Sequence, residues 1–201
     1  MFIPNVFIIE SLQFTDEKDD RYEGKFLSHI LHLGGKKSKY YYIRTLKELM
    51  EVLKIFKRSR YRYLHISCHG NDNYIYTTLD KLSFSNFSSI IKPYLKKKRL
   101  FISACSSTND QLASMIMPLS GCFSIIGPSE DIAFNDAAIA WAAFYHLIFK
   151  ENPRSTKRSI IKPALTNISN SFRIPFNYYS TDSGYPIGYK KIKISPTITT
   201  A

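Results

Sequence analysis

The sequence predicts an α/β protein in which helices flank a mostly parallel central sheet. Short apolar runs alternate along the chain with segments whose apolar residues recur at helical spacing, and this alternation is typical of α/β layers. The apolar runs are almost continuous rather than alternately polar, as expected for parallel strands that are covered on both faces. With 201 residues, the chain is long enough for one such domain with a substantial core.

Five apolar runs are the predicted strands. The first, NVFIIESL, is apolar from its second residue, and the second, KYYYIRT, carries aromatic residues that favour strands. The runs YRYLHIS, RLFISA and CFSIIG follow, each ahead of a polar turn. In residue numbers, the predicted strands are 5–12, 39–45, 61–67, 99–104 and 122–127.

Helices are predicted between and after these strands. Segment 46–59 has leucine, methionine and phenylalanine at helical spacing, which indicates an amphipathic helix with a basic outer face. Segment 135–150 is strongly helical, with Asn135 as its predicted N-cap. The other predicted helices are 25–33, ended by Gly34 and Gly35; 85–98, bent or ended near Pro93; 110–120, ended near Pro118; and 155–172.

Three segments carry weaker signals. Residues 15–24, TDEKDDRYEG, are predicted to form a charged loop, and residues 73–84 either a small hairpin or a loop. The tyrosine-, proline- and lysine-rich stretch after residue 172 has no predicted element. We expect one domain over residues 1–150 and a basic extension over residues 151–201 that packs on it.

The chain is basic, with a formal net charge of +12. Lysine and arginine concentrate in residues 36–62, in Lys92 with 96–99, and after residue 150. Such clusters indicate either a nucleic-acid surface or a solvated, lysine-rich surface. We expect no nucleic-acid partner, because the sequence has no RNA-recognition, zinc-finger or helix-turn-helix signature, and because its excess of Ile, Asn, Tyr, Phe, Ser and Lys is typical of an AT-rich genome.

The sequence predicts a cytoplasmic protein without a membrane partner. The N-terminal MFIPNVFIIE has no basic start and acidic residues follow it, so it indicates a strand rather than a signal peptide. The longest apolar run, 137–149, is too short to span a bilayer. Three cysteines without a closely spaced pair favour reduced thiols.

Two of the predicted strands end in groups that can do chemistry. His69 and Gly70 follow strand 61–67, and Cys105 follows strand 99–104. Sites form at the carboxyl ends of parallel strands, so two neighbouring strands would bring these groups to one edge of the sheet. A cysteine thiolate attacks carbonyl carbons, and a histidine can generate the thiolate and protonate the leaving group. The N–H groups of Gly70 and Cys105 can hold the developing oxyanion.

The same two blocks carry a family resemblance. LHISCHG and LFISACSS resemble the His-Gly and Ala-Cys blocks of the caspase-like cysteine peptidases, and they are most similar to those of bacterial CHAT domains. The first strand and IIGPSEDIAFNDAAIAWAAFYHLI, residues 125–148, also resemble the CHAT pattern, so the resemblance covers residues 5–150. Ser103 precedes Ala104-Cys105 where caspases have glutamine, so the chain does not resemble caspases in the narrow sense.

The resemblance implies a caspase-like three-layer sandwich, with residues 1–150 as a catalytic domain of a cysteine endopeptidase. It implies His69 and Cys105 as a catalytic dyad, Gly70 and Cys105 as the oxyanion hole, and no cofactor. The family does not require a third member of a triad, and the sequence offers no candidate for one. By the same resemblance, the protein is a regulated effector of a bacterial defence or cell-death system, which cleaves a protein substrate and is controlled by an activating or sensor protein.

Substrate preference in the resembling families depends on the loop before the last helix. In separases and many CHAT sequences an acidic residue there faces a basic substrate side chain; the matching position here is Phe134, with Asp131 and Asp136 close by. Phe134 predicts an apolar pocket for leucine, methionine or another uncharged residue, whereas a slip of one residue would make the pocket acidic. The acidic segment 16–23 is expected near the same edge, as a solvated loop or as an attraction for basic substrates.

Alternative interpretations concern the remaining histidine and cysteines. His65 lies inside a strand and is expected to be hydrogen-bonded and partly buried. Cys68 and Cys122 are expected in the core rather than on a metal, because adjacent Cys68 and His69 point opposite ways in an extended chain. Two other functions stay open: a non-catalytic module that binds nucleic acid or an acidic protein through its basic surface, and another cysteine enzyme such as an acyl or thioester hydrolase.

Overall fold

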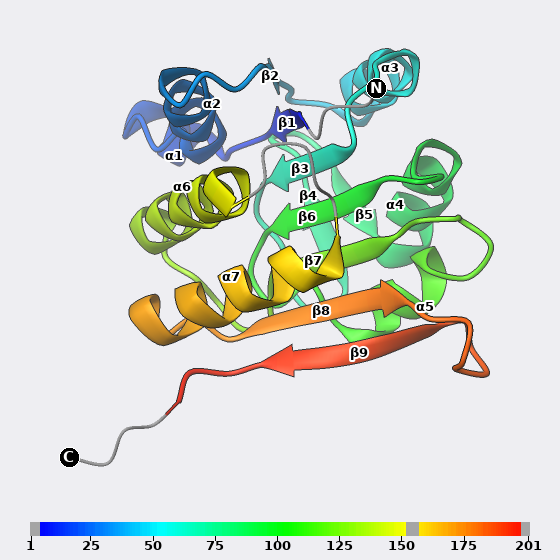
Figure 1. The fold of residues 1–201 in the computed structure, drawn as a ribbon. Coiled ribbons are helices and arrows are strands. Elements are labelled where there is room, and N and C mark those ends of the chain that lie inside the picture. Colours follow the sequence, from blue (N-terminus) through cyan, green and yellow to red (C-terminus); the bar gives the residue numbers. More distant parts are fainter. Residues whose placement is uncertain (1–4, 152–156, 198–201) are drawn as a thin grey trace.

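A seven-stranded sheet runs through the computed structural model, which describes residues 5–151 and 157–197. The strand order is β2-β1-β3-β6-β7-β8-β9 (Figure 1). The strands from β2 to β7 are mutually parallel, β8 is antiparallel to β7, and β9 is antiparallel to β8. The strands are β1 (Val6–Glu10), β2 (Ser38–Tyr42), β3 (Tyr63–Ser67), β6 (Arg99–Ser103), β7 (Ser124–Pro128), β8 (Phe176–Thr181) and β9 (Tyr189–Ile194).

Helices cover both faces of this sheet. Helices α2, α6 and α7 pack on one face, and α3, α4 and α5 pack on the other (Figure 1). The structure therefore confirms an α/β fold with a mostly parallel sheet flanked by helices. The remaining elements are α1 (Phe14–Lys18), α2 (Glu23–Leu33), α3 (Leu46–Arg58), β4 (Tyr74–Tyr76), β5 (Lys81–Ser83), α4 (Phe84–Ile91), the 3-10 turn η1 (Lys92–Tyr94), α5 (Asp110–Ile116), α6 (Phe134–Glu151) and α7 (Arg158–Phe172).

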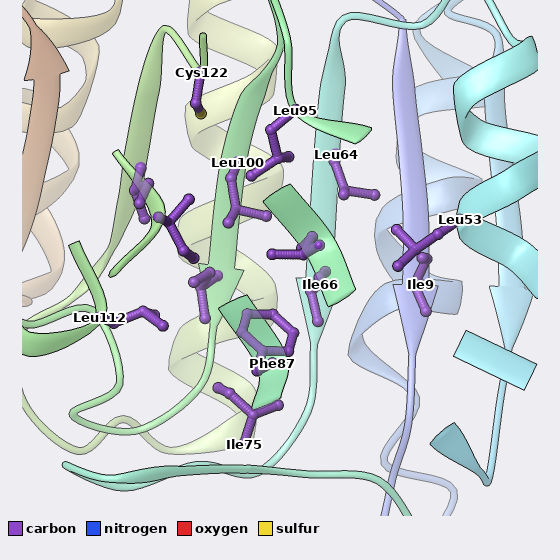
Figure 2. Close-up of a cluster of buried hydrophobic side chains, with 14 of the residues drawn as sticks. Ile9, Leu53, Leu64, Ile66, Ile75, Phe87, Leu95, Leu100, Leu112 and Cys122 are labelled. Atoms are coloured by element: carbon purple, nitrogen blue, oxygen red, sulfur yellow. The ribbon is translucent and has the colours of Figure 1, made fainter. Parts of the chain in front are cut away.

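The continuous apolar strands fill two cores, one on each face. In β1, Phe7 and Ile9 point into the core beneath α3, α4 and α5, whereas Val6 and Ile8 point into the core beneath α2, α6 and α7. Successive side chains alternate across a strand, so a strand that is covered on both faces must be apolar at every position. Figure 2 shows the first of these cores, in which Ile9 lies next to Leu53 of α3.

Asn135 does not cap α6, contrary to the sequence prediction. The helix begins one residue earlier, at Phe134, so Asn135 lies in its first turn. The Asn135 amide donates to Asp136 Oδ1 at 3.1 Å. Phe134 packs edge-on against the ring of His69, with the ring centroids 5.3 Å apart. We attribute the earlier start to this tertiary contact, which local sequence signals do not contain.

Two further segments differ from the sequence prediction or extend it. Residues 14–18 form helix α1 rather than a loop, with acidic residues in its first turn, where the helix dipole favours them. The stretch after residue 172 forms β8 and β9, which lengthen the sheet beyond β7. β9 is an edge strand rich in lysine, and lysine is a common protection of sheet edges that weakens the apolar signal of a strand. Of the two alternatives for residues 73–84, the hairpin β4–β5 is the one that forms.

Thr45 caps helix α3 in a reciprocal capping box. Thr45 Oγ1 accepts from Glu48 N at 3.2 Å, and the Glu48 carboxylate accepts from Thr45 N at 2.9 Å. Thr45→Ala is expected to lower the free energy of unfolding by about 1 kcal/mol, because the two backbone donors lose this reciprocal arrangement. Urea unfolding measures this loss. Thr166→Ala, at a half-buried position inside α7, is the control and should be neutral; an equal loss in both variants contradicts the assignment.

Glu10, the last residue of β1, caps helix α2 from outside that helix. Its carboxylate accepts from Gly24 N at 2.6 Å, from Lys25 N at 3.2 Å and from the Tyr40 hydroxyl at 2.7 Å. The two N–H groups belong to the first turn of α2 and have no partner within the helix. Burial outweighs these bonds and raises the pKa of Glu10 to about 7, and the nearby Glu23 adds to the rise.

The buried Glu10 carboxyl group should make stability depend on pH. Its pKa in the folded protein lies above the ordinary value of 4.5, so the folded chain binds more protons, and stability falls as pH rises from about 4.5 to about 7. In wild type this fall in the free energy of unfolding should be about 2 kcal/mol larger than in Glu10→Gln, which has no carboxyl group at this position. Urea unfolding at about pH 5 and about pH 8 compares the two proteins. Equal losses of stability in wild type and variant would contradict this prediction.

Candidate active site

The two chemically active blocks lie on neighbouring parallel strands. β3 and β6 pair so that Ser67 is opposite Ser103, and Cys68 N donates to Ser103 O at 3.0 Å. His69 and Cys105 each follow two residues after this last matched pair. The carboxyl ends of the two strands therefore deliver them to the same edge of the sheet (Figure 1).

A small cavity of about 60 Å³ joins these residues. Three residues singled out in the sequence, His69, Cys105 and Phe134, line it together. Gly70 and Ser106 follow His69 and Cys105 directly in the chain. Other members of the lining were not anticipated from the sequence as site residues, and they are Glu23, Cys68, Ser103, Ala104, Ile132 and Ala137.

Asp16 holds the histidine of this site. Its Oδ2 lies 2.6 Å from His69 Nε2, and its Oδ1 lies 3.3 Å from Arg21 Nη1. The Asp16 side chain is 6% exposed, whereas that of His69 is 29% exposed. A buried carboxylate beside Nε2 favours a proton on that nitrogen, which leaves Nδ1 as the free acceptor.

Little in the sequence marks Asp16 for this role. The residue is one of several acids in the segment 16–23, which is expected to lie near this edge as a whole. Helix α1 turns Asp16 inward and leaves its neighbours Asp19 and Asp20 exposed. Only the position of α1 after β1 separates one acid from the others, and that position is a tertiary property.

Cys105 differs from the other two cysteines in its environment. Cys68 and Cys122 are buried, as predicted, and burial raises the pKa of each thiol to about 12. Cys105 is only half-buried, and its Sγ donates to the Ile132 carbonyl at 3.7 Å. Within the described residues, Sγ makes no hydrogen bond to His69. The thiol is therefore directed to the Ile132 carbonyl, and it lines the same cavity as the histidine without a hydrogen bond to it.

Two backbone N–H groups, those of Gly70 and Cys105, also follow the carboxyl ends of β3 and β6. Gly70 and Ile75 form an antiparallel bridge. The hydrogen bonds of this bridge are made by the residues on either side of Gly70 and Ile75, so the Gly70 N–H points away from its partner strand. Within the described residues, neither the Gly70 N–H nor the Cys105 N–H donates to another protein group. The next residue, Ser106, has a positive φ of 52°, and this sharp turn follows the cysteine directly.

The three predicted substrate-binding residues lie in different places. Phe134 lines the cavity and packs on His69. Asp131 accepts from Ser106 Oγ at 2.8 Å and so braces the turn after Cys105, outside the cavity lining. Asp136 is exposed on α6 and accepts from the Asn135 amide. The structure thus brings Phe134 to the site, gives Asp131 a bracing contact, and leaves Asp136 on the helix surface.

A second polar cluster lies beneath the cavity. Glu23 Oε2 accepts from the Ser67 hydroxyl at 3.0 Å and from the Ser103 hydroxyl at 2.9 Å. Its Oε1 lies 3.5 Å from His65 Nε2, too far for a good hydrogen bond. His65 is fully buried, deeper than predicted, and its Nδ1 lies 3.2 Å from the Tyr145 hydroxyl. Glu23 therefore links the ends of β3 and β6 through their serines.

No protein-family model matches this chain, and no curated protein matches its sequence. In the part of the chain that the structure describes, no group of three or more His, Cys, Asp or Glu side chains is placed to hold a metal ion. No helix within residues 5–151 and 157–197 combines the length and the apolar character needed to cross a membrane.

Proposed function

We propose that the protein is a caspase-like cysteine endopeptidase of the CHAT type. The observation that carries the proposal is that His69 and Cys105 lie at one site. Both follow matched positions of neighbouring strands, and both line one cavity. A buried carboxylate also holds His69. Half-burial of Cys105, against full burial of the other two thiols, supports it as the reactive cysteine.

The first chemical step begins with the thiol. Cys105 Sγ turns from the Ile132 carbonyl towards His69 and transfers its proton to Nδ1. The thiolate then attacks the carbonyl carbon of a peptide bond, and the carbonyl oxygen becomes an oxyanion. Asp16 stabilises the resulting imidazolium through Nε2, as a positioning residue rather than as a base.

Two backbone donors after the carboxyl ends of β3 and β6 can hold this oxyanion. They are the N–H groups of Gly70 and Cys105, neither of which is used elsewhere in the described residues. Donors of this kind, fixed before the reaction, stabilise the developing charge. His69 then gives its proton to the departing amine, the acyl-cysteine remains, and water attacks it to release the acid and restore the thiol.

The substrate is a protein whose residue before the cleaved bond is uncharged. Phe134, Ile132 and Ala137 make the wall of the cavity apolar, and Glu23 accepts from two serines through Oε2 alone. The small cavity favours short apolar side chains over long basic ones. A regulated effector role in bacterial defence or cell death, with an activating partner protein, rests on the CHAT resemblance of His69-Gly70 and Ala104-Cys105.

Selective alkylation tests the proposed nucleophile first. Limiting iodoacetamide at neutral pH, followed by peptide mapping, should label Cys105 well ahead of Cys68 and Cys122, and His69→Ala should slow that labelling. A peptide library is then offered to the untreated protein, with the alkylated protein as the blocked control. Cleavage by the untreated protein alone supports the proposal. Labelling of Cys105 without cleavage of any peptide, even after co-expression with genomic neighbours that supply an activating partner, favours another cysteine hydrolase and counts against a peptidase.

A further inference from the structure

The charges of this basic protein are sorted between the two ends of its sheet. Thirteen of the sixteen acidic residues lie at or after the carboxyl ends of the strands from β1 to β7, or begin the next helix there. The exceptions are Glu51, Glu151 and Asp182. The thirteen are Glu10, Asp16, Glu17, Asp19, Asp20, Glu23, Glu48, Asp72, Asp80, Asp110, Glu130, Asp131 and Asp136. The candidate active site therefore lies at an acidic end.

The opposite end carries a row of cations. We call it the basic edge. It is formed by the last turn of α3 and the loops that lead into β2, β3 and β6, and its residues are Lys36, Lys37, Lys57, Arg58, Arg60, Arg62, Lys96 and Lys97. Arg58, Arg60, Lys96 and Lys97 are exposed. None of these four side chains forms an ion pair within the described residues, and the residues outside that part contain no Asp or Glu. The four cations are therefore exposed, and none is held in an ion pair among residues 5–151 and 157–197.

Hydrogen bonds tie the loops of the basic edge into one surface. Arg62 Nη1 donates to Lys97 O at 2.9 Å, and Arg99 N donates to Arg62 O at 2.9 Å. The Lys57 ammonium lies 5.6 Å from the centre of the half-buried Tyr94 ring. Lys98, half-buried beside this row, has its pKa lowered to about 8, chiefly by desolvation and to a smaller extent by the adjacent Arg62.

We propose that the basic edge binds the phosphate backbone of a nucleic acid. Arginine forks match phosphate oxygens in pairs, and three arginines alternate with other residues along 58–62. A domain with a pI near 9.5 and a row of exposed cations at one end has the electrostatic form of a nucleic-acid-binding protein. Tyr61 and Tyr94 are half-buried rings within this row, where bases can stack.

This inference does not depend on the proposed peptidase activity. The basic edge and the candidate site lie at opposite ends of β3 and β6 (Figure 1), so a bound nucleic acid leaves the cavity open. The acidic end repels phosphate and thereby orients the protein on it. The proposal also revises the expectation from the sequence, which contains no known nucleic-acid motif and could not show that these eight cations form one row.

Fluorescence anisotropy with labelled single-stranded RNA, single-stranded DNA and duplex DNA of about 20 nucleotides tests the proposal. Wild type should bind at low salt, and log K should fall linearly with log salt between about 50 and about 200 mM. The variant R58Q/R60Q/K96Q/K97Q should bind at least about tenfold more weakly, with a slope on single strands that is shallower by about 3, as four lost phosphate contacts require.

The matched control is K47Q/K162Q/R173Q/K193Q, which removes the same charge from exposed positions outside the basic edge. It should keep most of the affinity and the slope; equal losses in both variants would mean a diffuse charge effect and overturn the proposal. A competing partner is an anionic membrane, because Leu119 is fully exposed and Ile187 is 61% exposed at this end. Binding to phosphatidylserine vesicles that Leu119→Ser/Ile187→Ser abolishes, without any binding to the oligonucleotides, would also overturn it.

Discussion

Asp16→Asn is expected to lower kcat for peptide cleavage by about 100-fold or more, with little change in KM. The asparagine would keep the shape of the aspartate but could turn an amide N–H towards His69 Nε2. Nε2 then accepts, the imidazole proton moves to Nδ1, and the histidine loses the acceptor that receives the thiol proton. Loss of the carboxylate also removes its stabilisation of the imidazolium.

The kinetic measurement for Asp16 is paired with a readout that needs no substrate. The rate of Cys105 alkylation against pH should show the histidine-dependent limb in wild type and should lose it in Asp16→Asn. Asp19→Asn is the matched control, because Asp19 is an exposed acid of the same segment that also pairs with Arg21. If Asp16→Asn and Asp19→Asn have the same kcat, Asp16 has no positioning role.

Sequence patterns were sufficient for the elements whose signal is local. Strands β1, β3, β6 and β7 are buried on both faces and are therefore mostly apolar, and this pattern located them. The edge strand β2 is only partly buried, and its aromatic residues located it. The same patterns placed His69 and Cys105 just after two of those strands. Their arrival at one edge then required only that β3 and β6 be neighbours, which they are.

The rest of the site depends on contacts between distant segments. Asp16 reaches His69 across 53 residues of sequence, and no local signal marks it among the other acids of its segment. Glu10 caps α2 from β1, so the cap is absent from the sequence around the helix. β8 and β9 join the sheet through pairing with β7 and with each other. The apolar pattern of β9 is weak because this strand forms a lysine-rich edge.

Gly70→Ala is expected to lower kcat/KM by about 100-fold, the second large effect at this site. A methyl group at Gly70 would overlap Ser107 Oγ and would lie 3.1 Å from Ala104 Cβ. Ser107 is fully buried, and its hydroxyl donates to Cys105 O at 2.9 Å and to Asn71 O at 3.2 Å. Displacing Ser107 therefore disturbs the carbonyl of the nucleophile itself.

A double variant tests whether the clash between the new methyl group and Ser107 causes the loss of activity. Gly70→Ala/Ser107→Ala removes the overlapping oxygen and leaves the new methyl 3.3 Å from Cβ of residue 107, a distance that shifts of a few tenths of an ångström relieve. Ser107→Ala alone should cost about 1 kcal/mol of stability and little activity. The double variant should recover much of the activity lost in Gly70→Ala. Full activity in Gly70→Ala would show that the backbone at this position need not approach the nucleophile closely, and would remove Gly70 from the oxyanion hole.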